Sequence, residues 1–178
     1  MTGSAKYYVT LLVLVACGAT FAQQEKLPRG AAPIALGMSQ TEFEKITGAK
    51  PEPCLECITH EDRYLLLKTK GIFQDPSITE GADPSFFRGR LYRLGVPFEE
   101  KLKTVLPKYR GKYGPEKRHV DWGNGISAYI WEDSQTRLEI HHGTKDSKSF
   151  ALFFEDKELR QQLEAQYEKD KKAGINKE

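Results

Sequence analysis

The sequence predicts an α+β fold, in which short helices pack on one face of an antiparallel sheet. Two observations carry this prediction. Alternating segments in the C-terminal half are joined by short turns, and each half of the chain opens with a short amphipathic helix followed by strands. Short connections favour antiparallel neighbours, and helices segregated from runs of strands are typical of α+β domains. The order of elements also suggests a degenerate two-fold repeat of a helix followed by strands.

The N-terminus has the pattern of a secretory signal peptide. Lys6 supplies a positive charge, residues 7–16 form an apolar core, and small residues follow up to Ala22. The core is about half as long as a membrane-spanning helix requires. We therefore expect residues 1–22 to be removed and the protein to be exported.

A second cleavage site competes with the one after Ala22. Residues 14–17, Leu-Val-Ala-Cys, resemble the bacterial lipobox, in which the cysteine is lipidated and becomes the first residue. Cleavage after Ala22 gives a periplasmic or secreted protein, whereas acyl chains on Cys17 anchor it to a bacterial membrane. Spacing slightly favours the site after Ala22, and both alternatives stand.

The composition is that of an ordinary globular domain. The net charge is +2, with 29% charged and 11% aromatic residues, which provides no field that attracts nucleic acid or an anionic membrane. We expect a flexible tether at residues 23–33, a single domain at residues 34–168 and a charged tail at residues 169–178.

The first half of the predicted domain combines one helix, one long loop and strands. Residues 39–42, Ser-Gln-Thr-Glu, form a capping box that predicts a short helix ending at Gly48. The apolar run at residues 64–68 fits a strand, although its periodicity does not exclude a helix. Residues 72–87 are rich in turn formers and predict a long loop, and alternation over residues 88–96 predicts a strand.

The second half opens and closes with a helix. Apolar residues at helical spacing predict a helix over residues 99–109, which Pro107 should kink or shorten. Three alternating segments then predict an antiparallel meander at residues 125–132, 136–141 and 149–155. An apolar stripe that begins at Leu159 predicts the closing helix.

Two stretches resemble exported bacterial proteins. Residues 34–48, with the pattern Ile-x-Leu-Gly-Met-Ser-x-x-x-Phe-x-x-x-x-Gly, are similar to the opening of the SmpA/OmlA envelope lipoproteins. More broadly they resemble the two-repeat fold of the β-lactamase inhibitor proteins. Residues 112–115, Lys-Tyr-Gly-Pro, with the Trp122 segment after them, resemble secreted proteins of that architecture. The resemblance implies an open sheet face that binds another protein, although the loop at residues 72–87 and the C-x-x-C spacing depart from the short lipoproteins.

Cys54 and Cys57 form a C-x-x-C pair. Because Cys17 is either removed or lipidated, the two remaining cysteines are expected to form a disulfide in an oxidising compartment. Prolines precede the pair and no βαβ pattern surrounds it, which disfavours a redox centre. A structural disulfide is therefore expected, and an exported thiol-disulfide oxidoreductase is the alternative function.

Metal and haem sites at the same pair are disfavoured. Zinc bound by Cys54, Cys57 and His60 would lack a fourth ligand for a closed structural site. Haem attachment would require a histidine where Ile58 stands. The sequence therefore predicts no cofactor and no metal.

The predicted strand at residues 125–132 carries the candidate binding residues. Ile, Ala and Ile alternate there with Ser, Tyr129 and Trp131. One face should pack on helices, and the other should present Tyr129 and Trp131, with Trp122 nearby, because Tyr and Trp are favoured interface anchors. The alternative is that these rings belong to the core.

No motif of a known reaction accompanies these residues. His141 and His142 are neighbours on a strand and point to opposite faces, so they cannot chelate one metal as a simple pair. His119 and Asp121 share a face, but no recognisable nucleophile accompanies them. We therefore predict a non-enzymatic binding or structural role, with another envelope or secreted protein as the partner and no role for nucleic acid.

Overall fold

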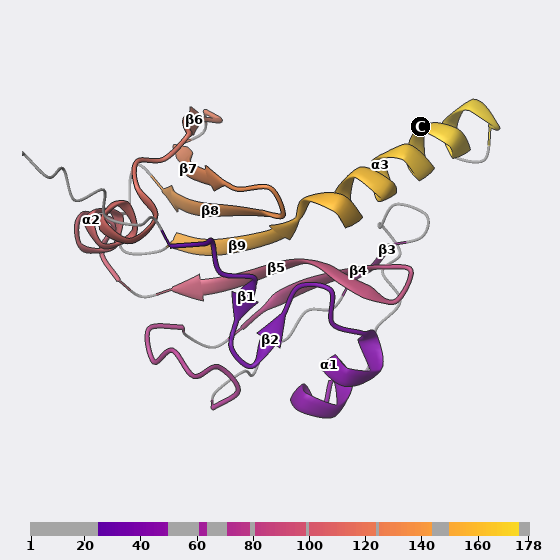
Figure 1. The fold of residues 1–178 in the computed structure, drawn as a ribbon, viewed down its shortest axis with the longest axis horizontal. Coiled ribbons are helices and arrows are strands. Elements are labelled where there is room, and N and C mark those ends of the chain that lie inside the picture. Colours follow the sequence, from indigo (N-terminus) through magenta and orange to yellow (C-terminus); the bar gives the residue numbers. More distant parts are fainter. Residues whose placement is uncertain are drawn as a thin grey trace, which may run out of the picture.

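A seven-stranded antiparallel sheet with strand order β3-β4-β5-β9-β8-β7-β6 forms the body of the molecule (Figure 1). The computed structural model describes residues 25–49, 61–63, 71–78, 81–98, 100–123, 125–143 and 150–174. The strands of the sheet are β3 (Glu61–Arg63), β4 (Asp83–Phe87), β5 (Arg90–Phe98), β6 (Arg118–Asp121), β7 (Ile126–Glu132), β8 (Thr136–Gly143) and β9 (Phe150–Asp156). The other elements are the hairpin of β1 (Gly30–Ala31) and β2 (Ile34–Ala35), and the helices α1 (Gln40–Thr47), α2 (Leu102–Tyr113) and α3 (Lys157–Lys172).

The fold is mostly sheet, and the predicted α+β fold with a helix layer and a degenerate repeat is wrong. β5 pairs with β9, so strands from both halves of the chain share one sheet and do not form two separate units. α1 and α2 lie at different ends of one face of the sheet, whereas α3 packs in a separate cluster and runs beyond the sheet, so the three helices form no single layer (Figure 1). The β5–β9 pairing joins segments far apart in the sequence, which local periodicity does not reveal.

The main hydrophobic core lies on one face of the sheet. Alternate residues of β5, β8 and β9 point to this face because successive strand side chains alternate. α1, α2 and the β1–β2 hairpin cover it, and the Phe43 ring of α1 meets Phe86 with centroids 5.2 Å apart. The buried residues at its centre are Leu94, Val96, Leu138, Ile140, Leu152 and Phe154.

The helix ends agree only partly with the prediction. The capping box is confirmed: Glu42 N donates to Ser39 Oγ, and Ser39 N donates to Glu42 Oε2 at 2.9 Å. Gly48 follows the helix in the left-handed conformation with φ 68°. Of the two effects predicted for Pro107, a kink or a shortening, the shortening is wrong, because α2 continues to Tyr113, and buried side chains on both sides of the proline hold the helix against the core.

Parts of the predicted tether and of the predicted tail are packed or helical where the structure describes them. Leu27 and Ala31 are buried, the Leu27 amide donates to Asp133 Oδ2 at 3.3 Å, and Arg29 forms an ion pair with Asp156. Residues 25–33 are therefore packed on the domain. α3 likewise continues to Lys172, past the predicted boundary.

Several predicted features lie outside the described residues. These are the signal peptide at residues 1–22, Cys17, the Cys54–Cys57 pair and the apolar run at residues 64–68. In the described part of the chain, no helix has the length and apolar character needed to span a membrane.

Candidate functional site

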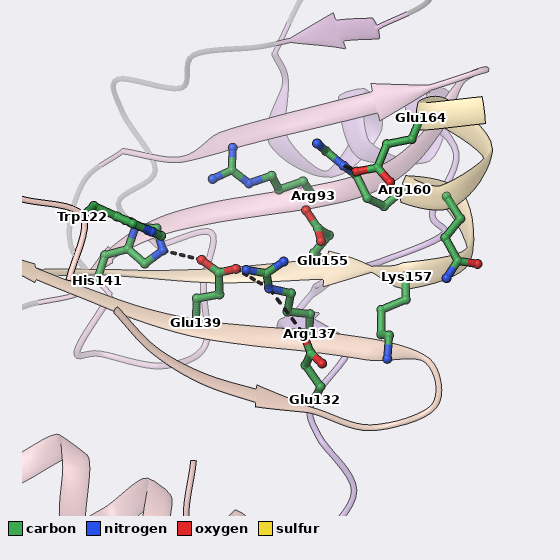
Figure 2. A pocket seen from close by; sticks show the side chains of 11 residues that line it. Arg93, Trp122, Glu132, Arg137, Glu139, His141, Glu155, Lys157, Arg160 and Glu164 are labelled. Carbon is green, nitrogen blue, oxygen red and sulfur yellow. Dashed lines mark hydrogen bonds and ion pairs between the residues drawn. The ribbon is translucent and has the colours of Figure 1, made fainter. Parts of the chain in front are cut away.

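The sheet face opposite the core is hollowed next to α3. A cavity of about 430 Å³ opens there between side chains of β5, β7, β8, β9 and the first turns of α3, with Trp122 at one end (Figure 2). Its volume falls within the range of small-ligand sites. We call this surface the open face.

A row of alternating charges crosses the open face. Glu132 on β7 is opposite Arg137 on β8, and Arg137 is opposite Glu155 on β9. Glu155 in turn is opposite Arg93 on β5. Oppositely charged cross-strand neighbours stabilise a sheet. The row therefore joins four adjacent strands and leaves both signs of charge at the surface.

Glu139 lies within a small charged network. It accepts a hydrogen bond from His141 Nε2 and forms an ion pair with Arg137 Nε. Burial alone would raise the pKa of Glu139, but the His141 hydrogen bond and the Arg137 charge outweigh burial and hold this pKa below its ordinary value. The Glu139 carboxylate is therefore ionised, and its charge is balanced by its neighbours.

Glu155 has the opposite electrostatic environment. Burial raises the pKa of its carboxyl group, and the charges of Arg160 and Arg137 offset only part of that effect. Within the described residues, this carboxyl group has no hydrogen-bond or ion-pair partner. Glu155 therefore carries less negative charge at mildly acidic pH than an exposed glutamate.

Three aromatic rings in contact run beside the charged row. The Trp122 ring meets His141 edge-on with centroids 4.5 Å apart, and His141 meets Phe153 at 4.3 Å. The guanidinium carbon of Arg93 lies 4.4 Å from the centroid of the same Phe153 ring. An exposed aromatic ring, Trp122, is thus linked through two further rings to a cation.

Trp131 belongs to the core, so its predicted role as a surface anchor is wrong. It is 2% exposed, its Nε1 donates to the Gly114 carbonyl at 2.9 Å, and its ring lies 6.0 Å from the Tyr109 ring of α2. α2 covers the face of β7 that carries Tyr129 and Trp131. The sequence alternation separated the two faces of β7 correctly but did not show which one is covered.

The other two candidate binding residues are separated by the sheet. Tyr129 is half-buried on the core side, stacked between His119 at 4.3 Å and His142 at 5.5 Å. Trp122 is 48% exposed and lies at the edge of the open face. Of the three predicted residues, only Trp122 is therefore part of the hollowed surface.

The predicted His119 and Asp121 pair has separate local contacts. Asp121 Oδ1 accepts from the Gly123 amide at 2.9 Å and closes a turn, while His119 stacks on Tyr129. A serine–histidine hydrogen bond does occur nearby, between Ser127 Oγ and His142 Nε2 at 2.6 Å. Ser127 is only 3% exposed, so this bond fits a structural contact better than a nucleophile.

No metal site is found in the part of the chain that the structure describes. That part contains no group of three or more His, Cys, Asp or Glu side chains arranged to hold an ion. Cys54, Cys57 and His60 lie outside it.

Sequence reasoning missed most of the open face. The available signal was the alternation of Arg137, Glu139 and His141 along one strand, which places three polar side chains on one side. His141 was considered as a metal ligand, whereas its side chain is mostly buried and contacts Glu139 and Phe153.

Comparisons with known proteins do not assign this chain to a family. No family model matches the sequence, and no curated protein matches it. Among solved structures, it is similar to a DUF4309 family protein (YjgB) from Bacillus subtilis subsp. subtilis str. 168, with 15% identity, a TM-score of 0.47 and coverage of 74% of this chain and 87% of that one. It is also similar to a cysteine-rich secretory protein from Staphylococcus aureus subsp. aureus Mu50, with 9% identity, a TM-score of 0.49 and coverage of 76% of this chain and 49% of that one. The chain therefore spans about half the length of the staphylococcal protein.

Proposed function

We propose that this protein is an exported, non-enzymatic binding protein whose open face binds another envelope or secreted protein. The observation that supports this most is the hollowed, charge-rich sheet surface with Trp122 exposed at its edge. Protein interfaces typically combine an aromatic anchor with surrounding polar and charged side chains. The open face has this composition.

Recognition suits the open face better than catalysis. Its charges are largely engaged with one another, as in the contacts of Glu139 with Arg137 and His141. Such internally balanced networks fix the shape and the charge pattern of a surface. A matching arrangement of charges on a partner would therefore select that partner and fix its orientation.

The N-terminal sequence supports export. Lys6, the apolar core at residues 7–16 and the small residues up to Ala22 have the pattern of a signal peptide. Cleavage after Ala22 gives a periplasmic or secreted protein, and lipidation of Cys17 gives a membrane-anchored one. In both cases the partner is met outside the cytoplasm.

Site-specific photo-crosslinking in the producing cells tests this function. A photoreactive phenylalanine analogue replaces Trp122 at the open face or, as a matched control, Ile46 on α1. Both native side chains are large, hydrophobic and exposed, at 48% and 41%. We expect one discrete protein adduct from position 122 and not from position 46. Absence of an adduct at position 122, or the same adducts at both positions, contradicts the proposal.

A further inference from the structure

Arg93 has an unusual position within the open face. Among the described residues, its guanidinium group donates no hydrogen bond and forms no ion pair. It is half-buried over the Phe153 ring, and Figure 2 shows it directed toward Trp122 and His141. A guanidinium that stacks on a ring keeps N–H donors free along its edge. These donors face the hollow without a partner.

The other cations around the hollow are engaged. Arg160 Nε donates to Glu164 Oε1 at 2.7 Å, and Lys157 Nζ donates to the Asp133 carbonyl at 2.9 Å. Arg137 contacts two glutamates, with its Nε 3.7 Å from Glu132 Oε1. Within the described residues, Arg93 is therefore the lining arginine or lysine that neither donates a hydrogen bond nor forms an ion pair.

The carboxylates near Arg93 form no direct ion pair with it. Glu139 is paired with Arg137 and His141. Glu155 is the direct cross-strand neighbour of Arg93, yet the two form no ion pair. Burial raises the pKa of Glu155 and so weakens its negative charge. The positive charge of the Arg93 guanidinium is thus only partly balanced by neighbouring carboxylates, which favours binding of an anion.

We propose that Arg93 anchors the partner protein by binding the side-chain carboxylate of an Asp or Glu residue. The planar fork of a guanidinium matches a carboxylate with two parallel hydrogen bonds. The rings of Phe153, His141 and Trp122 lie next to Arg93 and would take an apolar side chain beside the acidic one. The partner segment is therefore acidic with an apolar neighbour, such as an aromatic residue. This inference rests on the proposed function and names the chemistry of the partner.

A side-chain carboxylate fits this surface better than a chain-terminal one. The hollow is lined by side chains from four strands and one helix and lies on an open sheet face, so a peptide can continue past Arg93 in both directions. Capture of a chain terminus typically uses backbone amides arranged as a closed nest. Apart from Trp122, the residues that line this hollow belong to regular strands and to α3.

Binding of short capped peptides to the exported protein tests the inference. The probe is acetyl-Gly-Phe-Glu-Gly-amide, and its Gln counterpart lacks only the charge. A third peptide carries Gln with a free terminal carboxylate. We expect the Glu peptide to bind at least about tenfold more tightly than the Gln peptide, as loss of a charged hydrogen bond implies. Calorimetry or chemical-shift titration measures the ratio.

Protein variants assign the effect to Arg93. Arg93→Gln should abolish the preference for the Glu peptide, and Arg93→Lys, which keeps the charge without the fork, should retain part of it. Arg90→Gln is the matched control, because Arg90 lies on the same strand, is exposed and donates to the Gly37 carbonyl away from the hollow. Far-UV circular dichroism and urea midpoints of each variant establish that it is folded.

Three results overturn the inference. The first is that the Glu peptide binds no more tightly than the Gln peptide, and the second is that a free terminal carboxylate restores the affinity of the Gln peptide. The third is that Arg90→Gln reduces the preference for the Glu peptide as much as Arg93→Gln does. Photo-crosslinking from position 122, with and without Arg93→Gln, distinguishes an error in the role of Arg93 from an error in the proposed function. An adduct that forms undiminished in the Arg93→Gln background contradicts the role of Arg93 alone. An adduct that forms in neither background contradicts the proposed function itself.

Discussion

The ring of Phe153 occupies the space that a side chain at Gly95 would fill. The two residues are direct cross-strand partners on β9 and β5, and a Cβ atom at Gly95 would lie 2.6 Å from Phe153 Cε1. The same ring contacts Arg93 and His141. An aromatic ring laid over a strand glycine restores the packing that the glycine lacks. The placement of Arg93 therefore depends on the absence of a side chain at Gly95.

Gly95→Ala should destabilise the protein and displace the Phe153 ring. Because the clash is with a packed ring, we expect a loss of about 1–3 kcal/mol in the free energy of unfolding, the usual range for overpacking. Gly111→Ala is the control, since a Cβ there meets no atom within 4 Å and the position lies in α2. Alanine in a helix should stabilise slightly. Urea denaturation measures both, and equal effects would contradict the role assigned to Gly95.

Trp131→Ala and Trp122→Ala should differ strongly in stability. Truncating the buried Trp131 removes core packing and should cost about 3–5 kcal/mol. Truncating the exposed Trp122 should change stability by about 0.5 kcal/mol or less. Chemical denaturation of the two variants checks this. A loss of several kcal/mol in unfolding free energy for Trp122→Ala, or a negligible loss for Trp131→Ala, would contradict the burial assigned to the two rings.

Local sequence patterns predicted the local structure, whereas the arrangement of the whole sheet depends on pairing between strands far apart in the sequence. The Ser39 capping box and the three-strand meander depend on residues close in sequence, and both are present. The β5–β9 pairing joins the two halves and has no local signature. It places strands from the two halves of the predicted repeat next to each other in the sheet.

The errors at the candidate site also arise from contacts between residues that are far apart in the sequence. β7 alternates apolar residues on both faces, so periodicity separates the faces without showing that α2 covers the one with Trp131. On the other face, Ala128 and Ile130 are buried, and charged side chains such as Glu139 lie opposite them. The Leu27 amide donates a hydrogen bond to Asp133, a contact that no pattern near the N-terminus indicates.

Glu139→Gln and Glu155→Gln should change the pH dependence of stability in opposite directions. The folded-state pKa of Glu139 is lowered, so its ionised form stabilises the fold above its ordinary pKa of 4.5, and this contribution is lost as pH falls. Glu139→Gln should therefore destabilise at pH near 7, and the difference should shrink under acid conditions.

The sign is reversed for Glu155. Its folded-state pKa is raised above 4.5, so its ionisation opposes folding, and the penalty grows as pH rises through the folded-state pKa. Glu155→Gln should stabilise at neutral pH and lose that advantage below the ordinary pKa. Unfolding free energies of both variants and the wild type across this range provide the check. Parallel changes in the two variants would contradict the opposite environments of the two carboxyl groups.

The mature N-terminus should be Gln23 or a lipidated Cys17. Both cleavage sites precede Glu25, whose amide donates to the Lys112 carbonyl at 3.3 Å, and Leu27, which is buried. The packed N-terminal segment is therefore retained in both forms, and their folded domains should be equally stable. Intact-protein mass spectrometry of the protein recovered from the envelope and the medium identifies the form. Cys17→Ser is the decisive variant, because it removes the acyl mass if lipidation occurs and leaves a chain starting at Gln23 unchanged. A recovered protein that keeps residues 1–22 with an unmodified Cys17 would contradict export by either route.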